Sequence, residues 1–368
     1  MNNISVIIAG GGTGGHISPG IALYEEFREQ GVRALFLATG KDRRFSSLDD
    51  IESGDLFFYP APTMTRNILK LPVFAINFIL AMFRTRSIIL KFGVKAVIGM
   101  GGYVSAPALL CAKIMKVPVF LCEQNSVPGR VTRIFDTAAV KIFSTFEGAR
   151  AHIKNGDAFM LTGNPIRGKV LSEVSQEEAR KAFYLSHCRY VLLAIGGSQG
   201  ALRINELIYK LKKNYPEQLK DTGIIWSTGD YSYKKYRDLI QNEMGEGMIY
   251  ISPFIDNVGL AYRACDIAIS RSGAGVMMEL AAMGVPSVLI PYPHAAMNHQ
   301  DKNADEFVER GAALKVGDAD ADPEKVAPVI MGLLNDPRRL KKMSGEALAV
   351  SKRDSSSIIT GEVIRHIR

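Results

Sequence analysis

Residues 5–20 read Ser-Val-Ile-Ile-Ala-Gly-Gly-Gly-Thr-Gly-Gly-His-Ile-Ser-Pro-Gly, and this stretch decides the fold of the first half of the chain. Its β-branched apolar start, residues 6–9, predicts a buried parallel strand. The glycines from Gly10 to Gly15 then allow a sharp turn and a close approach of the backbone to a ligand. A helix is expected over residues 17–30, so its N-terminal N–H groups and dipole would face the turn. We therefore predict an anion-binding strand–turn–helix here.

The alternation of apolar runs and helical stretches continues along the chain and begins again near its middle. A second glycine turn, at residues 196–201, follows a fresh apolar run. Strands alternating with helices predict parallel, doubly wound sheets, so we expect an α/β fold of two Rossmann-like domains. The expected strands are residues 6–9, 34–38, 56–59, 96–100, 117–122, 141–144 and 158–161, then 190–195, 224–227, 248–251, 267–270, 287–290 and 313–316.

The length of 368 residues fits two domains. We place the first at residues 1–163 and the second at residues 164–344, and we expect the helical tail at residues 345–368 to pack back on the first. The four cysteines form no Cys-x-x-Cys pair, which favours free thiols in a reducing compartment. The N-terminal apolar run is short and lacks a preceding basic segment, so it predicts a strand rather than a signal peptide.

The net charge of +8 is concentrated in one stretch. Residues 56–122 contain no Asp or Glu, and their basic residues are Arg66, Lys70, Arg84, Arg86, Lys91, Lys95, Lys113 and Lys116. Such a zone favours an anionic partner, either lipid headgroups or nucleic acid. No recognisable nucleic-acid module accompanies it, so we expect no nucleic-acid partner.

Within this basic zone, residues 71–83 are apolar apart from Asn77. A helix of that length is too short to cross a bilayer. The stretch therefore predicts either a core helix of the first domain or a helix that lies on a membrane surface, with basic residues at the headgroups.

The first glycine turn also fits the G-x-G-x-x-G pattern of dinucleotide sites through Gly10, Gly12 and Gly15, but that pattern alone is weak. The second strand ends at Thr39-Gly40 without an acidic residue placed to bind a ribose, which argues against NAD. Neither glycine turn continues into Gly-Lys-Ser/Thr, which excludes a P-loop. We expect no cofactor.

Two acidic features remain in the second half. Glu279 lies one turn into a helix whose N-terminus can hold phosphate, which suits a nucleotide with its ribose on Glu279; a simple charge partner for the helix is the alternative. Asp318, Asp320 and Asp322 have the spacing of metal-dependent transferases, but they precede Pro323 and a helix. A cap and turn is therefore favoured, and no metal is expected.

Six short motifs occur in a fixed order: Gly-Gly-Thr-Gly-Gly-His at 11–16, Glu-Gln-Asn at 123–125, Gly-Asn-Pro-Ile-Arg at 163–167, Gly-Gly-Ser-Gln-Gly-Ala at 196–201, Arg-Ser-Gly-Ala at 271–274 and His-Gln-x-x-Asn-Ala at 299–304. As an ordered set, over essentially the whole chain, they resemble the bacterial glycosyltransferases of family 28. The resemblance implies a GT-B fold, with two Rossmann-like domains facing across a cleft. It also implies transfer of GlcNAc from UDP-GlcNAc to lipid I, the undecaprenyl-diphosphate-linked N-acetylmuramoyl pentapeptide, with inversion, giving lipid II. A related lipid galactosyltransferase and a UDP-GlcNAc 2-epimerase are the alternatives.

The resemblance also implies a role for each matching residue. His16 is the candidate general base, because imidazole titrates near neutral pH, or else it orients the acceptor. Glu123 is a weaker candidate base that could instead position Asn125. The implied binding residues are Thr13, Gly14 and Gly15 for acceptor diphosphate or donor sugar, Asn125 for GlcNAc, Arg167 and Ser198 for the UDP diphosphate, Ile255 for uracil, Ala274, Gly275, Val276, Met277, Met278 and Glu279 for ribose and phosphate, and Gln300 for sugar hydroxyls. Residues 275–278, Gly-Val-Met-Met, differ from the small and hydroxyl-bearing residues of some relatives, which puts their local contacts in doubt but preserves Glu279.

The implied partners are UDP-GlcNAc, lipid I and the anionic lipids of the inner leaflet, with other cell-wall synthesis and division proteins as further candidates. A lipid-linked acceptor implies a peripheral enzyme on the cytoplasmic face of the bacterial plasma membrane. Residues 71–83 would dock there, with Arg66, Lys70, Arg84 and Arg86 among the headgroups.

Overall fold

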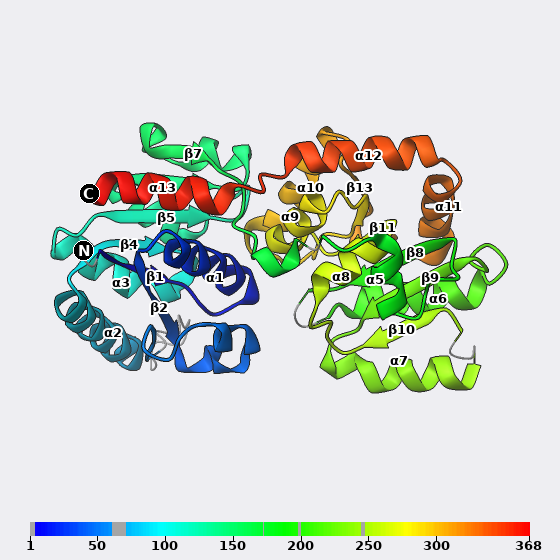
Figure 1. The fold of residues 1–368 in the computed structure, drawn as a ribbon, viewed down its shortest axis with the longest axis horizontal. Helices are drawn as coiled ribbons and strands as arrows, with labels where there is room; N and C mark the ends of the chain where they lie inside the picture. The colour runs from blue at the N-terminus through cyan, green and yellow to red at the C-terminus, as the bar shows by residue number, and fades with distance from the viewer. Residues whose placement is uncertain (1–3, 61–70, 172, 198–199, 244–246) are drawn as a thin grey trace. The chain divides into compact units, whose positions relative to one another are not determined.

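The computed structural model describes residues 4–60, 71–171, 173–197, 200–243 and 247–368, and the chain forms two compact units (Figure 1). One unit comprises Met1–Arg167 together with Arg353–Arg368, and the other comprises Gly168–Lys352. Each unit contains one parallel β-sheet, in agreement with the predicted α/β fold.

The first unit has a seven-stranded sheet in the order β3-β2-β1-β4-β5-β6-β7, with every neighbouring pair parallel. Its strands are β1 Ser5–Ala9, β2 Arg33–Thr39, β3 Leu56–Tyr59, β4 Val94–Gly99, β5 Val119–Glu123, β6 Lys141–Ser144 and β7 Phe159–Leu161. The strand order reverses between β1 and β4. In open α/β sheets this reversal is where ligands bind, outside the carboxyl ends of the strands.

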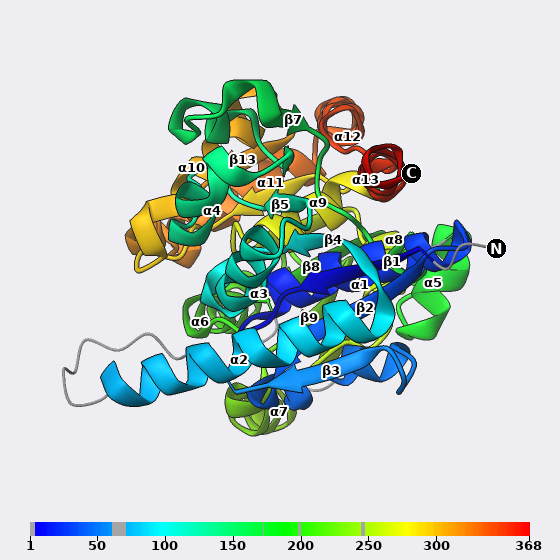
Figure 2. The same cartoon turned by 90° about the vertical axis from the view of Figure 1, so that its left-hand side faces the viewer.

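Helices cover both faces of this sheet: α1 Gly14–Glu29, α2 Leu71–Phe92, α3 Gly102–Ile114, α4 Arg130–Phe135 and α13 Ser355–Ile367. Successive residues of a strand point to opposite faces, so the sheet contributes to two separate cores. Val6 and Ile8 pack in the core that includes α1 and α13, whereas Ile7 and Ala9 pack in the core that includes α2 and α3. Figure 2 shows α2 along its face of the sheet beside α3.

The last helix, α13, packs on α1 although more than 300 residues separate them in sequence. Ile359 and Val363 are fully buried in the same core as α1. The Gln30 side-chain amide donates a hydrogen bond to the Thr360 hydroxyl at 2.7 Å, and the Ser355 hydroxyl donates one to the Gly163 carbonyl at 3.0 Å. The chain therefore leaves the first unit after Arg167 and returns to it at Arg353.

The expectation that the apolar helix ends near residue 83 is wrong, because α2 continues to Phe92 and has 22 residues. It is long and apolar enough to cross a membrane by length and composition alone. The helix continues past Arg84 and Arg86 because both side chains are exposed and so do not disturb the packing against the unit. Thr85, between them, is buried, and its hydroxyl donates a hydrogen bond to the Ala81 carbonyl at 2.9 Å.

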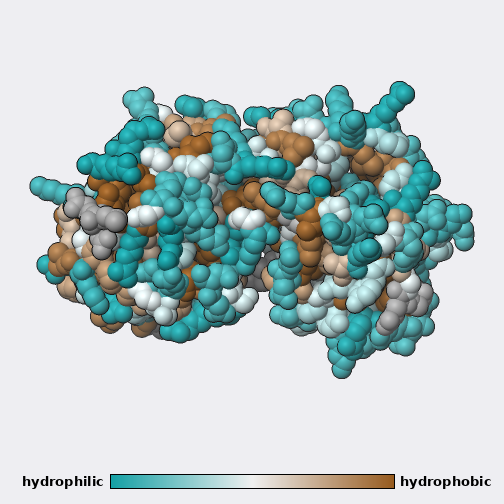
Figure 3. All heavy atoms as spheres, viewed as in Figure 1, coloured by the Kyte–Doolittle hydropathy of each residue, from teal (hydrophilic) through white to brown (hydrophobic). Residues whose placement is uncertain are grey.

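One side of α2 packs into the first unit, and the opposite side is exposed and apolar. Ala81, Ile88 and Ile89 belong to the buried core. The exposed large apolar residues of the helix are Leu71, Val73, Ile76, Ile79, Leu80, Phe83 and Leu90. In Figure 3 hydrophobic side chains reach the surface at the part of the first unit where α2 lies in Figure 1. The helix is therefore a core helix along one side, as one of the two alternatives predicts, and it also presents an exposed apolar side.

The second unit has a six-stranded parallel sheet in the order β10-β9-β8-β11-β12-β13. Its strands are β8 Tyr190–Ile195, β9 Thr222–Ser227, β10 Ile249–Ser252, β11 Ile267–Ser270, β12 Ser287–Leu289 and β13 Ala313–Lys315. Its helices are α5 Gln176–Ala182, α6 Leu202–Asn214, α7 Asp230–Glu243, α8 Val258–Ala264, α9 Ala274–Ala282, α10 His299–Glu309, α11 Pro323–Leu334 and α12 Pro337–Val350. This order repeats that of the first six strands of the first sheet, so the reversal lies between β8 and β11.

Single 3-10 turns join many of these elements. In the first unit they are η1 Gly40–Arg44, η2 Ser46–Asp50, η4 Asp136–Ala138, η5 Glu147–His152 and η6 Gly156–Ala158; in the second they are η7 Gly168–Val170, η8 Ala296–Asn298 and η9 Asp318–Asp320.

Candidate active site

The first glycine turn joins β1 to α1 at the point where the first sheet reverses. Gly12 has a φ of 85°, which favours glycine, and Thr13 is the N-cap residue of α1. Gly14 and Gly15 form the first turn of that helix, and His16 follows with its side chain partly exposed. The predicted strand–turn–helix is therefore present, with the helix beginning three residues earlier than expected.

The imidazole of His16 lies between this turn and a second one that follows β4. Gly101 and Gly102 have φ angles of 87° and 67°. A Cβ atom built on Gly101 would lie 3.3 Å from His16 Nε2, and one built on Gly102 would lie 3.2 Å from His16 Cε1. Larger residues at these two positions would therefore displace the imidazole, so the second glycine turn makes room for it.

One contact of His16 Nδ1 fits the tautomer with the proton on that atom. This atom lies 3.3 Å from the Gly11 carbonyl oxygen and 3.1 Å from the Thr13 hydroxyl. A carbonyl oxygen only accepts hydrogen bonds, so Nδ1 carries the proton when it bonds to Gly11. Nε2 then holds the lone pair, which is the arrangement that a general base requires.

Asp42 fixes the shape of the first glycine turn, and it is not among the site residues predicted from the sequence. Its side chain is 1% exposed and comes from η1, directly after β2. Asp42 Oδ1 accepts a hydrogen bond from the Gly12 N–H at 2.8 Å, while Oδ2 accepts bonds from the Thr39 N–H at 2.9 Å and the Thr39 hydroxyl at 2.7 Å. A Cβ atom on Gly11 would lie 2.3 Å from Oδ2, so glycine is required there as well.

The spacing Thr39-x-x-Asp42 resembles a capping box, and this was the available signal for Asp42. The same contacts make the acidic side chain that follows the second strand unavailable for a hydrogen bond to a ribose, as a dinucleotide site would need. The only carboxylate in η1 is turned inward and bonded to the glycine turn.

Glu123 is buried beneath the loop that follows β5. Glu123 Oε1 accepts a hydrogen bond from the Asn125 N–H at 3.0 Å, and Oε2 accepts bonds from the Gly129 N–H at 3.0 Å and the Thr132 hydroxyl at 2.6 Å. Burial raises the pKa of Glu123 above its usual value, and these three donors oppose the shift. The carboxylate is thus bonded on both oxygens to the loop that carries Asn125.

Arg167 is the last residue of the first of the two segments that form the first unit, and its side chain is 5% exposed. Nη2 lies 2.8 Å from a Glu25 carboxylate oxygen and 2.6 Å from one of Asp50. Nε donates a further bond to Glu25 at 3.2 Å. The residue predicted to hold the UDP diphosphate is therefore paired with two carboxylates of its own unit.

The glycine turn of the second unit follows β8 and is tightly packed. Gly197 and Gly200 have φ angles of 83° and 73°. A Cβ atom on Gly200 would lie 2.1 Å from the Thr228 carbonyl oxygen, so the turn lies directly against the end of β9. Ser198, predicted to bind diphosphate, lies outside the described residues.

Across the sheet reversal, the Arg-Ser-Gly-Ala motif joins β11 to α9. Gly273 is the N-cap and provides no side-chain cap, so the N–H groups of the first turn begin at Ala274. Glu279 follows on the same helix, partly exposed, and its Oε2 accepts a hydrogen bond of 2.8 Å from the Tyr262 hydroxyl. Burial first, and the Glu279 charge second, raise the pKa of Tyr262 well above its usual value. Tyr262 therefore stays a donor that holds Glu279 in place.

The remaining predicted residues of the second unit differ in exposure. Met277 and Met278 are buried, which leaves only their backbone for contact with a ligand, whereas Gly275 and Val276 are partly exposed. Gln300 lies in the first turn of α10, where its side-chain oxygen accepts a hydrogen bond from the Tyr292 N–H at 2.9 Å.

Ile255 is buried in the loop after β10. The Ser252 hydroxyl donates a hydrogen bond of 2.6 Å to the Phe254 carbonyl and so closes this loop. The side chain of Ile255 packs inside the unit, and its backbone is the part that a base could contact.

The three aspartates with metal-site spacing each pair with a basic side chain. Asp318 pairs with Arg271, Asp320 with Lys325, and Asp322 with Arg203. Asp318–Asp320 form η9, and Asp322 is the N-cap residue of α11 with Pro323 after it. The turn and the N-cap position agree with the sequence prediction, although the Asp322 side chain pairs with Arg203 and makes no capping hydrogen bond. In the ranges that the structure describes, no group of three or more His, Cys, Asp or Glu residues is placed to hold a metal ion.

Comparison with known sequences gives matches over both units. Residues 6–144 match the glycosyltransferase family 28 N-terminal domain, and residues 191–358 match the glycosyltransferase family 28 C-terminal domain. The chain is 34% identical to the UDP-N-acetylglucosamine–N-acetylmuramyl-(pentapeptide) pyrophosphoryl-undecaprenol N-acetylglucosamine transferase of Halothermothrix orenii, with 95% of each chain covered. It is 36% identical to the protein of the same name from Thermodesulfovibrio yellowstonii, with 94% of each covered.

Solved structures show the same fold. A crystal structure of MurG from Acinetobacter baumannii matches with a TM-score of 0.74 at 23% identity and covers 99% of both chains. The UDP-GlcNAc 2-epimerase of Neisseria meningitidis, bound to UDP-GlcNAc, matches with a TM-score of 0.70 at 16% identity, over 98% of this chain and 100% of that one.

Proposed function

The chain belongs to glycosyltransferase family 28, and on this premise we propose that it transfers GlcNAc from UDP-GlcNAc to the 4-hydroxyl of the muramoyl group in lipid I, giving lipid II for peptidoglycan synthesis. The observation that carries the proposal is the near-complete coverage, at 34–36% identity, of relatives named for this transfer. The first unit would bind the acceptor and the membrane, and the second would bind UDP-GlcNAc.

We propose that His16 acts as the general base. The muramoyl 4-hydroxyl oxygen attacks the anomeric carbon of GlcNAc and forms the new C–O bond, while the bond from that carbon to the UDP oxygen breaks. The hydroxyl proton passes to His16 Nε2, and the configuration at the anomeric carbon inverts. The contact between Nδ1 and the Gly11 carbonyl supports this role because it places the lone pair on Nε2.

We assign Glu123 a positioning role rather than that of the base. Its oxygens already accept hydrogen bonds from Asn125, Gly129 and Thr132, so it holds the loop and thereby Asn125, which would bind the GlcNAc moiety.

The leaving UDP would be bound by the second unit, with its diphosphate at the N-terminus of α9 and at Ser198, its ribose at Glu279 and its uracil at the backbone of Ile255. Gln300 would bind the sugar hydroxyls. Helix N-termini favour anions through their N–H groups and dipole. Arg167 would add a positive charge after exchanging its ion pairs with Glu25 and Asp50 for phosphate oxygens.

We propose that the enzyme docks peripherally on the cytoplasmic face of the membrane through α2. Val73, Ile76, Leu80 and Phe83 follow one another at helical spacing and are all exposed. An apolar stripe with basic residues beside it is suited to insertion at the headgroup boundary. The burial of Ile88 and Ile89 in the core supports docking rather than spanning, because a spanning helix would have to leave that core.

The decisive experiment is transfer of labelled GlcNAc from its UDP donor to a short-chain lipid I analogue, with and without EDTA. Labelled disaccharide-lipid in both tubes supports the proposal. Loss of product with EDTA would require a metal site. Absence of product, with UDP-GlcNAc still bound, would favour another acceptor or 2-epimerisation of the donor, which the fold of the epimerases also allows.

A further inference from the structure

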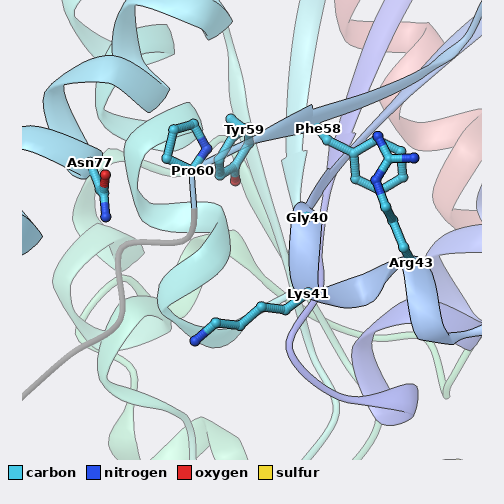
Figure 4. A pocket seen from close by; sticks show the side chains of 7 residues that line it. All are labelled: Gly40, Lys41, Arg43, Phe58, Tyr59, Pro60 and Asn77. Atoms are coloured by element: carbon cyan, nitrogen blue, oxygen red, sulfur yellow. The ribbon is translucent and has the colours of Figure 1, made fainter.

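A cavity of about 570 Å³ opens in the first unit between the end of β3, the turn η1 and the helix α2 (Figure 4). It lies at the carboxyl ends of β2 and β3, the same edge of the sheet that carries the first glycine turn. None of the roles assigned above uses it.

The wall formed by η1 is held in place by Asp42. This residue points inward and bonds the Gly12 N–H, whereas its two neighbours Lys41 and Arg43 are exposed and line the cavity. In Figure 4 the Lys41 ammonium points toward the side of the cavity where Asn77 lies, while the Arg43 guanidinium lies over the ring of Phe58, 4.1 Å from its centroid. Lys41 and Arg43 therefore flank the residue that is bonded to the glycine turn before His16.

Two further lining residues connect the cavity to neighbouring helices: Tyr59 to α3 and Asn77 to α2. Tyr59 is buried, and its hydroxyl donates a hydrogen bond to the Val104 carbonyl of α3, the helix that starts at the second glycine turn. Asn77 is the polar residue that interrupts the otherwise apolar start of α2, and it is half-buried where it lines the cavity.

The cavity therefore offers two cations, one amide and aromatic rings, and no acidic side chain is among the described residues that line it. These groups bind a carboxylate or a phosphate through charge-assisted hydrogen bonds. Resting on the proposed function, we propose that the cavity is an acceptor subsite for the carboxylate at the end of the muramoyl peptide.

The chemistry of the acceptor favours the peptide over the diphosphate as the source of this anion. The peptide is attached through the 3-oxygen of the muramoyl ring, next to the 4-hydroxyl that must reach His16. A five-residue peptide spans up to about 17 Å when extended, and the cavity lies at the same edge of the sheet as the glycine turn that precedes His16. Lys41 and Arg43 would then bind its terminal carboxylate, and Phe58 and Tyr59 would pack against its side chains.

Steady-state kinetics with three acceptors on one lipid test the proposal: the pentapeptide, the pentapeptide with a C-terminal carboxamide, and a muramoyl lactamide without peptide. For the double variant Lys41→Gln/Arg43→Gln we expect the KM of the pentapeptide acceptor to rise about tenfold or more. The KM of UDP-GlcNAc and the KM of the two acceptors that lack the terminal carboxylate should stay within about twofold, because these acceptors lack the group that the two cations would bind. The charge-matched control Lys95→Gln/Lys220→Gln, at exposed positions away from the cavity, should leave all values unchanged.

Equal increases for all three acceptors would overturn the assignment, because the anion would then be the diphosphate that they share. No increase for any acceptor would overturn the subsite itself. Binding of a soluble muramoyl pentapeptide, measured by calorimetry against its carboxamide, gives a second readout that needs no transfer: wild-type protein should prefer the carboxylate, and the variant should not. Failure of the proposed function is distinguishable, since wild-type enzyme would then form no product with any acceptor.

Discussion

Asp42 Oδ1 accepts a hydrogen bond of 2.8 Å from the backbone N–H of Gly12, thirty residues earlier in the chain. This contact joins the end of β2 to the glycine turn after β1, and Gly11 in that turn lies within hydrogen-bond distance of His16 Nδ1. A buried carboxylate is therefore part of the support for the candidate base.

Replacement of Asp42 by Asn tests this support. An amide cannot accept from the Gly12 N–H and the Thr39 N–H at once, so one buried donor loses its partner and the turn shifts. We expect kcat to fall about 10- to 100-fold, as for a small misplacement of a catalytic group. Thr39→Val is the matched control because it removes one donor to Asp42 and keeps the bond to Gly12. Similar kcat losses in both variants would mean that Asp42 only supports the end of β2.

Replacement of His16 by Ala should lower turnover by about 10²- to 10⁴-fold, because a positioned general base contributes a factor of that size. Binding of UDP-GlcNAc should stay measurable by calorimetry. Near-normal turnover would remove His16 as the base and leave it an orienting role.

Replacement of Glu123 by Gln separates its two roles. As a positioning residue, Glu123 should give a variant with a reduced kcat or a higher KM of UDP-GlcNAc, and with the acid limb of its pH profile intact. Burial raises the pKa of Glu123, so a catalytic Glu123 would itself produce that limb, and the variant would lose it. The pH profile of kcat/KM from pH 5 to 9 decides between the two.

Replacement of Tyr262 by Phe removes the donor that holds Glu279. We expect the KM of UDP-GlcNAc to rise about tenfold, the worth of a hydrogen bond to a charged group, with little change in the KM of the acceptor. Tyr236→Phe, at another buried tyrosine of the second unit, is the control and should leave the KM of UDP-GlcNAc unchanged. Unchanged donor binding in the Tyr262 variant would argue against Glu279 as a ribose ligand.

Charge reversal of Arg84 and Arg86 to Glu should weaken binding to anionic vesicles by about 30-fold or more, since each basic residue near such a surface contributes about 1 kcal/mol. Lys341→Glu/Lys342→Glu, on exposed positions of α12, makes the same change in net charge elsewhere. Co-sedimentation with vesicles of phosphatidylglycerol and phosphatidylethanolamine measures the effect. Equal losses in the two variants would point to net charge alone, and no loss would exclude α2 as the docking surface.

The strands could be predicted from the sequence because their apolar runs are bounded by glycines and polar residues. The predicted bounds of residues 56–59, 141–144, 190–195 and 267–270 agree with β3, β6, β8 and β11. The end of α2 could not be predicted from composition, because Arg84 and Arg86 interrupt the apolar run without interrupting the helix.

Some residues of the candidate site could likewise be predicted from the sequence, and others could not. His16 and the loop after Glu123 are found from local motifs, since each follows a strand end within a few residues. Asp42 is not, because its partner Gly12 is distant in sequence and only the parallel pairing of β1 with β2 brings them together. The partners of Arg167 are missed for the same reason, since Glu25 and Asp50 lie more than 100 residues earlier.

The return of α13 to the first unit has a consequence for synthesis on the ribosome. The core around α1 includes Ile359 and Val363, so the N-terminal unit cannot complete its packing when its own 167 residues have emerged. The second unit has a continuous sequence and can fold before α13 is translated. Until α13 has been synthesised, one apolar face of the first sheet is therefore incompletely covered. During that interval this sheet is the part of the nascent chain that is most exposed to aggregation and most in need of a chaperone.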